Sequence, residues 1–166
     1  MWEEVTSTLA EEFSSLPDAA EVTRVMVRLL LAALLGGIVG YEREHKGKAA
    51  GLRTHMLVAM GAALFVLVPE RGGMGIADMS RVIQGVVAGV GFLGAGAIIK
   101  RHSEEQVQGL TTAAGIWMTA AIGVACGLGR EAIALLAIVI LVMLPHVVSA
   151  PPPQADAEPD TKPRET

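Results

Sequence analysis

Hydrophobic residues gather in five long runs, and most of the charged residues lie in short groups between them. The runs cover residues 22–41, 52–68, 82–99, 110–128 and 132–148. Each run has 17 to 20 residues, which is about enough for a helix to cross a hydrocarbon layer roughly 30 Å thick. Because lipid cannot satisfy an open backbone, such segments have to be helical. The pattern predicts an all-α integral membrane protein with five transmembrane helices.

Two stretches of the chain resemble each other at a constant spacing of 58 residues. Residues 51–63 and 109–121 share identical residues at six pairs of positions, among them Gly51/Gly109 and Thr54/Thr112. Because each copy contains two helices, the second copy returns in the same orientation as the first. The repeat therefore predicts two parallel helical hairpins, related by a pseudo-axis along the membrane normal. The fifth helix has no counterpart in the repeat.

The segments outside the runs have a different composition. Residues 1–21 are acidic, and their apolar positions fall on one helical face, which predicts an amphipathic segment. An acidic start is also unlike a secretory signal peptide, which begins basic. Residues 149–166 form a proline-rich, charged tail that is expected to be disordered. The whole chain has 18% charged residues and a mean hydropathy of +0.50, so the five runs at 22–148 account for its membrane character.

The distribution of Lys and Arg predicts the orientation. Eight of these residues flank the side that includes the loop after the first run and the tail, and five flank the other side. Since cytoplasmic loops are enriched in Lys and Arg, the N-terminus is expected outside and the C-terminus in the cytoplasm.

Glycine is frequent inside the runs, and the chain contains 19 glycines in all. Small residues let the backbones of membrane helices approach closely. Two uses stay open, packing within the bundle or an interface with another subunit. The candidate packing positions are Gly36, Gly40, Gly85, Gly89, Gly91, Gly94 and Gly96.

Ionisable and polar residues near the ends of the runs form two candidate functional clusters. The outer cluster comprises Arg28, Asp78, Arg81 and Gln84, with Arg28 expected to pair with Asp78. The inner cluster comprises Glu42, Arg43, Glu44, Arg53 and His55. The alternative is that these side chains only anchor the helix ends at the membrane surface.

The sequence contains no arrangement that favours enzymatic chemistry or a bound metal. No Asp or Glu lies in the middle third of a run, whereas a Mg²⁺ or Ca²⁺ site needs several oxygen ligands. No nucleophile can be paired with a base, and the histidines do not have the spacing of a metal motif. We therefore expect no enzyme activity, no cofactor and no nucleic-acid partner.

The chain from residue 28 to residue 129 resembles the MgtC/SapB family of bacterial inner-membrane proteins. The resemblance lies in 34–44 (LLGGIVGYERE), 51–63 (GLRTHMLVAMGAA), 78–81 (DMSR), 89–99 (GVGFLGAGAII) and 109–123 (GLTTAAGIWMTAAIG). It implies five membrane helices with the N-terminus outside and the C-terminus in the cytoplasm. It also adds Thr54, Thr111 and Thr112 to the inner cluster, because these threonines match the family pattern.

The resemblance implies a function as well. The family is linked to survival at low Mg²⁺, to virulence in pathogens and to inhibition of the F-type ATP synthase. The chain differs from many members in having Gln108 before its Gly-Leu-Thr-Thr motif, and it ends in a tail where longer members carry a soluble domain. It is thus expected to be a short, SapB-like member that acts as a non-catalytic modulator of Mg²⁺ homeostasis or membrane energetics through helix contacts. Expected partners are the lipid bilayer, the ATP synthase or another membrane protein, and further copies of the chain. The alternative function is an ion or small-solute channel or transporter.

Overall fold

The computed structural model describes residues 1–14, 18–100 and 107–147, so the predicted proline-rich tail lies outside the described residues. The described part contains six helices and one pair of two-residue antiparallel strands. In chain order the elements are α1 (Trp2–Ser14), α2 (Ala19–His45), α3 (Leu52–Arg71), α4 (Ile76–Ala97), β1 (Ile99–Lys100), β2 (Val107–Gln108), α5 (Leu110–Gly127) and α6 (Glu131–Val147).

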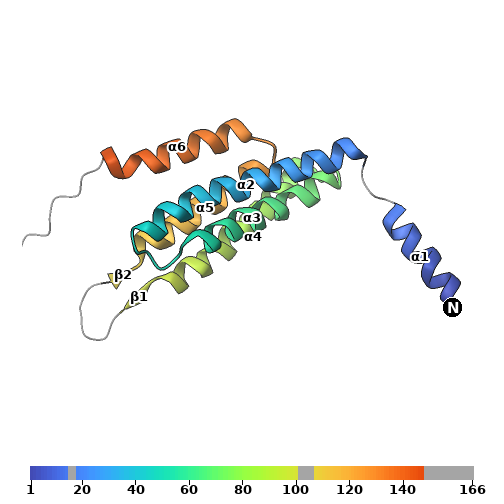
Figure 1. The fold of residues 1–166 in the computed structure, drawn as a ribbon, viewed down its shortest axis with the longest axis horizontal. Coiled ribbons are helices and arrows are strands. Elements are labelled where there is room, and N and C mark those ends of the chain that lie inside the picture. The colour runs from blue at the N-terminus through green and yellow to red at the C-terminus, as the bar shows by residue number, and fades with distance from the viewer. Residues whose placement is uncertain (15–17, 101–106, 148–166) are drawn as a thin grey trace, which may run out of the picture.

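Helices α2 to α6 lie side by side along the long axis of the molecule, and α1 extends away from them (Figure 1). Helix α5 is central, because it packs against α2, α3, α4 and α6. The end of the bundle where α2 and α4 finish and α3 and α5 begin is called here the inner end, after the predicted orientation. The opposite end is called the outer end.

Four helices, α2 to α5, are long and apolar enough to cross a membrane. Helix α6 is apolar but shorter, and its fully described part ends at Leu144. The helical membrane class predicted from the hydrophobic runs is therefore confirmed, with four candidate spans.

Several helices extend beyond the hydrophobic runs. Helix α2 covers Ala19–His45, where the run covered 22–41, and α4 starts at Ile76, where the run started at 82. A hydrophobic run measures the depth of the hydrocarbon layer, whereas helical hydrogen bonding continues into the polar flanks.

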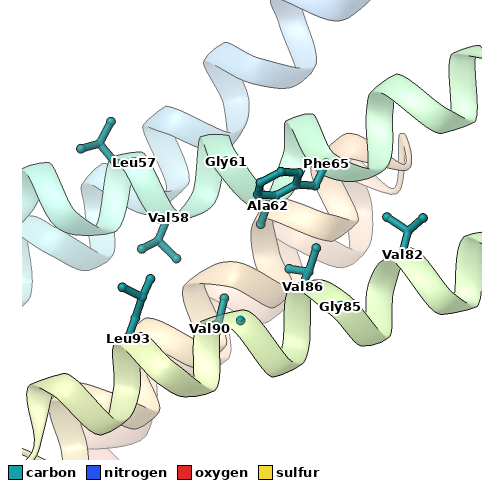
Figure 2. Close-up of a pocket in the computed structure, with 11 residues that line it drawn as sticks. Leu57, Val58, Gly61, Ala62, Phe65, Val82, Gly85, Val86, Val90 and Leu93 are labelled. Atoms are coloured by element: carbon teal, nitrogen blue, oxygen red, sulfur yellow. The ribbon is translucent and has the colours of Figure 1, made fainter.

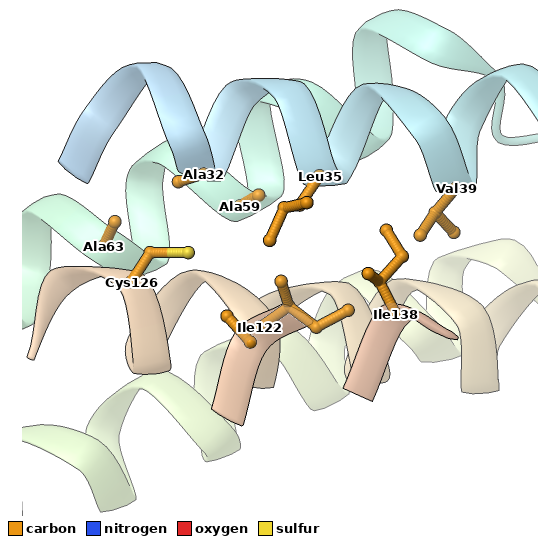
Figure 3. Packing of buried hydrophobic residues seen from close by; sticks show 9 residues of the cluster. Ala32, Leu35, Val39, Ala59, Ala63, Ile122, Cys126 and Ile138 are labelled. Atoms are coloured by element: carbon orange, nitrogen blue, oxygen red, sulfur yellow. The ribbon is translucent and has the colours of Figure 1, made fainter. Parts of the chain in front are cut away.

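The main core lies where α2, α3, α5 and α6 meet, and it consists largely of small side chains (Figure 3). Its buried residues are Ala32, Leu35, Val39, Ala59, Ala63, Ile122, Cys126, Ala134 and Ile138. Glycines bring the helices even closer together. A Cβ atom at Gly36 would lie 2.6 Å from the His55 carbonyl oxygen, and one at Gly123 would overlap the carbonyl of Ala59. Close backbone approach is thus what packs this bundle.

The two similar stretches of sequence make corresponding contacts. Gly36 of α2 packs against the backbone of His55 on α3, and Gly94 of α4 packs against Ala113 on α5. Gly94 lies 58 positions after Gly36, and Ala113 lies 58 positions after His55. The first contact is the tighter one, since a Cβ atom at Gly94 would be 3.5 Å from its nearest neighbour.

Candidate functional site

A buried polar cluster lies between α2, α3 and α5 toward the inner end. The side chain of His55 is completely buried, and its Nδ1 lies 2.8 Å from the hydroxyl oxygen of Thr119. The Thr119 hydroxyl donates its proton to the carbonyl oxygen of Gly115, at 2.9 Å. Because a hydroxyl has a single proton, His55 Nδ1 must be the donor to Thr119. In the neutral ring, Nε2 then carries the lone pair, and it has no hydrogen-bond partner among the described residues.

Arg43 lies beside this histidine. A Cβ atom at Gly115 would be 3.6 Å from both Arg43 Nε and His55 Cε1, so the missing side chain leaves room for both groups. Arg43 Nε lies 3.2 Å from a carboxylate oxygen of Glu42. Thr112 is also buried, one turn before Gly115 on α5. Residues from three helices thus place one cation and the Thr119 hydroxyl next to a buried histidine.

Among the other residues of the predicted inner cluster, Glu42 is joined to this group through its ion pair with Arg43. Glu42 also forms an ion pair with Lys46. A carboxylate oxygen of Glu44 accepts a hydrogen bond of 2.8 Å from the backbone N–H of Leu52, so Glu44 caps the start of α3. The remaining three, Arg53, Thr54 and Thr111, are exposed.

Arg28 organises a second polar cluster at the outer end. One of its terminal nitrogens donates to Glu70 of α3 at 3.2 Å and to the carbonyl oxygen of Gly127 at 2.9 Å. Its Nε lies 4.0 Å from Glu131 at the start of α6. The side chain is 12% exposed. Arg28 therefore joins four helices and satisfies a carbonyl at the C-terminus of α5, where a cation is favoured.

The expected pairing of Arg28 with Asp78 is wrong. Arg28 points toward α3 and α5, whereas Asp78 is exposed in the first turn of α4. Arg81 and Gln84 are exposed on α4 as well. Glu70 also contacts Arg71, and neither residue belongs to the predicted outer cluster. Several acidic residues flank the outer ends of the runs, and no periodicity of the sequence selects among them.

The glycines of α4 are placed differently from those of α2. Gly36 and Gly40 pack tightly inside the bundle, but a Cβ atom added at Gly85, Gly89, Gly91 or Gly96 would have no neighbour within 4 Å. These four glycines therefore do not mediate helix packing within the described bundle. The reason is that α4 rests on α5 through a different face, which contains Val90 and Gly94.

An apolar groove lies between α3 and α4, and Gly85 and Gly89 form part of its wall (Figure 2). Its volume is about 600 Å³, and it is lined by apolar residues such as Leu57 and Phe65 of α3 and Leu93 of α4. Within the described residues, no three His, Cys, Asp or Glu side chains gather as a metal-binding group would require.

These apolar helices, with polar side chains gathered at both ends, define a multi-pass membrane protein. Residues 29–150 match the model of the MgtC family. The chain belongs to this family.

Three curated relatives illustrate the relationship. SrpB of Synechococcus elongatus is 51% identical over 113 residues, which cover 61% of this chain and 62% of SrpB. YhiD of Escherichia coli K12, named as a proposed magnesium transporter, is 49% identical over 63% of this chain and 51% of its own length. MgtC of Salmonella typhimurium is 44% identical over 70% of this chain and 48% of its own length. The matched region thus spans about half to three fifths of these relatives. No solved structure matches the chain.

Proposed function

We propose that this protein is a non-catalytic modulator of Mg²⁺ homeostasis or membrane energetics in the bacterial inner membrane. In this proposal it acts by helix contact with a membrane partner. The link to Mg²⁺ comes from relatives, of which YhiD carries a name that refers to magnesium transport. The mode of action is argued from the bundle itself.

The closed centre of the bundle carries the proposal. Between the Arg43–His55 cluster and the Arg28 cluster, the contact of α2, α3 and α5 is filled by apolar residues. Ala32, Ala59, Ala63 and Cys126 are each completely buried there. Transporters of ions usually place ionisable groups along the path through the membrane. A packed apolar layer favours contact over conduction.

Helix α4 offers the surface for such a contact. Ala88, Gly91 and Ala95 are exposed and follow one another at helical spacing on the face turned away from the bundle, with Gln84 one turn further out. Small residues allow close approach of a second helix, and an amide can form a hydrogen bond across the interface. We call these four residues the outward face of α4.

The proposed topology has five membrane spans, with the N-terminus outside and the C-terminus in the cytoplasm. Helix α6 supports a fifth span because it lies alongside the other helices (Figure 1) and packs on the core through Ala134 and Ile138. The corresponding contacts of Gly36 and Gly94 support two parallel hairpins that descend from one repeated unit.

Two measurements test the mode of action. A photo-reactive residue placed at Ala88 should form an adduct with a membrane protein in intact cells, and subunits of the F-type ATP synthase are the first candidates to probe. The same group at Leu34, which is exposed on α2, is the matched control. Gly91→Leu should remove the adduct, because a large side chain keeps the two backbones apart.

The second measurement is Mg²⁺ flux into proteoliposomes that contain the purified full chain. The modulator proposal predicts flux no greater than in empty vesicles. Flux that Asp78→Ala or Glu42→Ala abolishes would contradict it and support the transporter alternative. Equal adducts from Ala88 and Leu34 would contradict the assignment of the contact to α4.

A further inference from the structure

The α3–α4 groove is unusual for a membrane bundle because two neighbouring helices leave space between them. Figure 2 shows Val58 of α3 facing Leu93 of α4 across this space, and Phe65 of α3 and Val86 of α4 also line it. A Cβ atom at Gly61, Gly85 or Gly89 would meet no atom within 4 Å. The volume of about 600 Å³ therefore belongs to open space and is not occupied by other described side chains.

The two ends of the groove differ in charge. At the inner end, Thr54 continues the face of α3 that lines the groove, and Arg53 lies one turn before Leu57. Both are exposed, and neither side chain has a hydrogen bond or ion pair to another described residue. At the outer end, Asp78 lies one turn before Val82 and Arg81 lies one turn before Gly85, and both are exposed. An anionic group is thus favoured at the inner end over the outer end, where a carboxylate and a guanidinium of α4 offset each other.

The inner end has a further feature that favours an anion. Arg53 and Thr54 lie in the first turn of α3, where backbone N–H groups and the helix dipole attract negative charge. The carboxylate of Glu44 already accepts from the first of these N–H groups, that of Leu52. The guanidinium and the hydroxyl next to it are both suitable donors for phosphate oxygens.

We propose that the α3–α4 groove binds an acyl chain of an anionic phospholipid, whose phosphate is held by Arg53 and Thr54 at the inner end. An apolar wall accepts the chain, the space left by three glycines gives it room, and the charge difference between the two ends sets its direction. In the proposed topology this lipid comes from the cytoplasmic leaflet, where basic residues between membrane helices bind anionic headgroups. The inference requires α3 and α4 to cross the membrane, but it does not rest on the modulator function.

The experiment uses the full chain in nanodiscs of phosphatidylcholine with a small fraction of phosphatidylglycerol that carries a diazirine on its acyl chain. After illumination, mass spectrometry locates the labelled residues. Label should concentrate on Leu57, Phe65 and Leu93 and exceed that on Leu34 and Ile140, which are exposed on α2 and α6. Unlabelled phosphatidylglycerol should compete for the groove, and an equal amount of phosphatidylcholine should not.

Two pairs of variants test the binding of the lipid headgroup and the binding of its acyl chain separately. Arg53→Gln should lower groove labelling about tenfold, as expected for the loss of one charge-assisted hydrogen bond. Lys48→Gln, exposed near the same end, should leave the labelling unchanged. Gly89→Leu should fill the groove and abolish its labelling, whereas Gly91→Leu, on the outward face of α4, should not. Neither glycine has a neighbour that a new Cβ atom would strike, so both variants should fold, and circular dichroism checks this.

Three results would overturn the proposal. Label spread evenly over all exposed apolar positions would show that the groove holds no specific chain. Groove labelling that is unaffected by Arg53→Gln and indifferent to the headgroup would exclude the anionic site. Cross-links from groove residues to a second copy or another protein, in place of lipid, would assign the groove to a helix. Failure here with an intact adduct at Ala88 would leave the proposed function standing, because the two tests use different faces of α4.

Discussion

Helices α4 and α5 are both rich in glycine, yet they use it in opposite ways. In α5, half of the apolar window is buried, and Gly115, Gly123 and Gly127 are all among the buried residues. In α4 only 17% of the corresponding window is buried, and four of its glycines have open space around them. The same residue type brings helices together in one place and leaves a surface open in the other. A glycine in a membrane helix therefore permits close approach, but it does not determine whether another helix of the bundle makes use of it.

The largest effect is expected at Gly123 of α5. A leucine there would overlap the backbone of Ala59, and neither backbone can move without separating α3 from α5. We expect Gly123→Leu to lower the free energy of unfolding by more than about 3 kcal/mol or to prevent folding. Denaturant titration of the purified protein in detergent measures this. Gly89→Leu on α4 is the matched control, and an equal loss in both variants would contradict the comparison.

The second-largest loss of stability is expected at Arg28, because this residue connects α5 with α3 and α6. Arg28→Gln leaves the carbonyl of Gly127 and the carboxylate of Glu70 without their shared donor. We expect a loss of about 2 kcal/mol, reduced from the value for a fully buried pair because Glu70 is partly exposed. The same titration provides the measurement, and Arg24→Gln, at an exposed position of α2, is the control. A loss of unfolding free energy no larger than that of the control variant would show that Arg28 does not stabilise the contact between these helices.

A substitution at Thr119 tests how much the buried hydrogen bond between α5 and α3 contributes to stability. Thr119→Val keeps the shape of the side chain but removes the acceptor for His55 Nδ1, and the histidine is completely buried. The cost of an unsatisfied buried donor is about 1–2 kcal/mol. Thr111→Val, exposed on the same helix, should change stability by less than about 0.5 kcal/mol. Similar values for the two variants would show that the His55–Thr119 hydrogen bond does not stabilise the bundle.

The smallest expected effect is a gain in stability on α4. At Gly85 an added methyl group meets no atom within 4 Å, and the residue lies inside a regular helix. Gly85→Ala should therefore raise the free energy of unfolding by about 0.5 kcal/mol, because it restricts the unfolded chain. Gly36→Ala, in the tight contact of α2 with α3, should lower it. A decrease at both positions would mean that α4 packs more closely than the described structure indicates.

The class of fold and the starts of two helices could be predicted from the sequence. The runs at 52 and 110 begin where α3 and α5 begin, since Gly51 and Gly109 end the preceding loops at both positions. Gly109 has a φ of +97°, which side chains with a Cβ rarely adopt. The start of a helix depends on a few neighbouring residues, so it can be predicted without knowledge of how the helices pack.

The candidate site could be predicted only in part. Arg43 and His55 do lie side by side against α5, but Thr119, which forms a hydrogen bond with His55, was not among the predicted site residues. Arg28 lies in a polar cluster at the outer end, but its acidic partners there are Glu70 and Glu131 and not Asp78. Which ionisable groups meet depends on the rotation of each helix about its axis. That rotation is set by contacts between helices that are distant in the sequence.

The length of the hydrophobic runs and the helical class were determined by the sequence by itself, because each depends on composition and spacing along a single segment. The partners of Arg28, the burial of His55 and the difference between the glycines of α4 and α5 were decided by the tertiary structure. The physical reason is that small residues and charges have no intrinsic preference for a particular neighbour in a bundle. Their role follows from which helix faces come within a few ångströms of one another, and in this protein those faces are selected by close packing around α5.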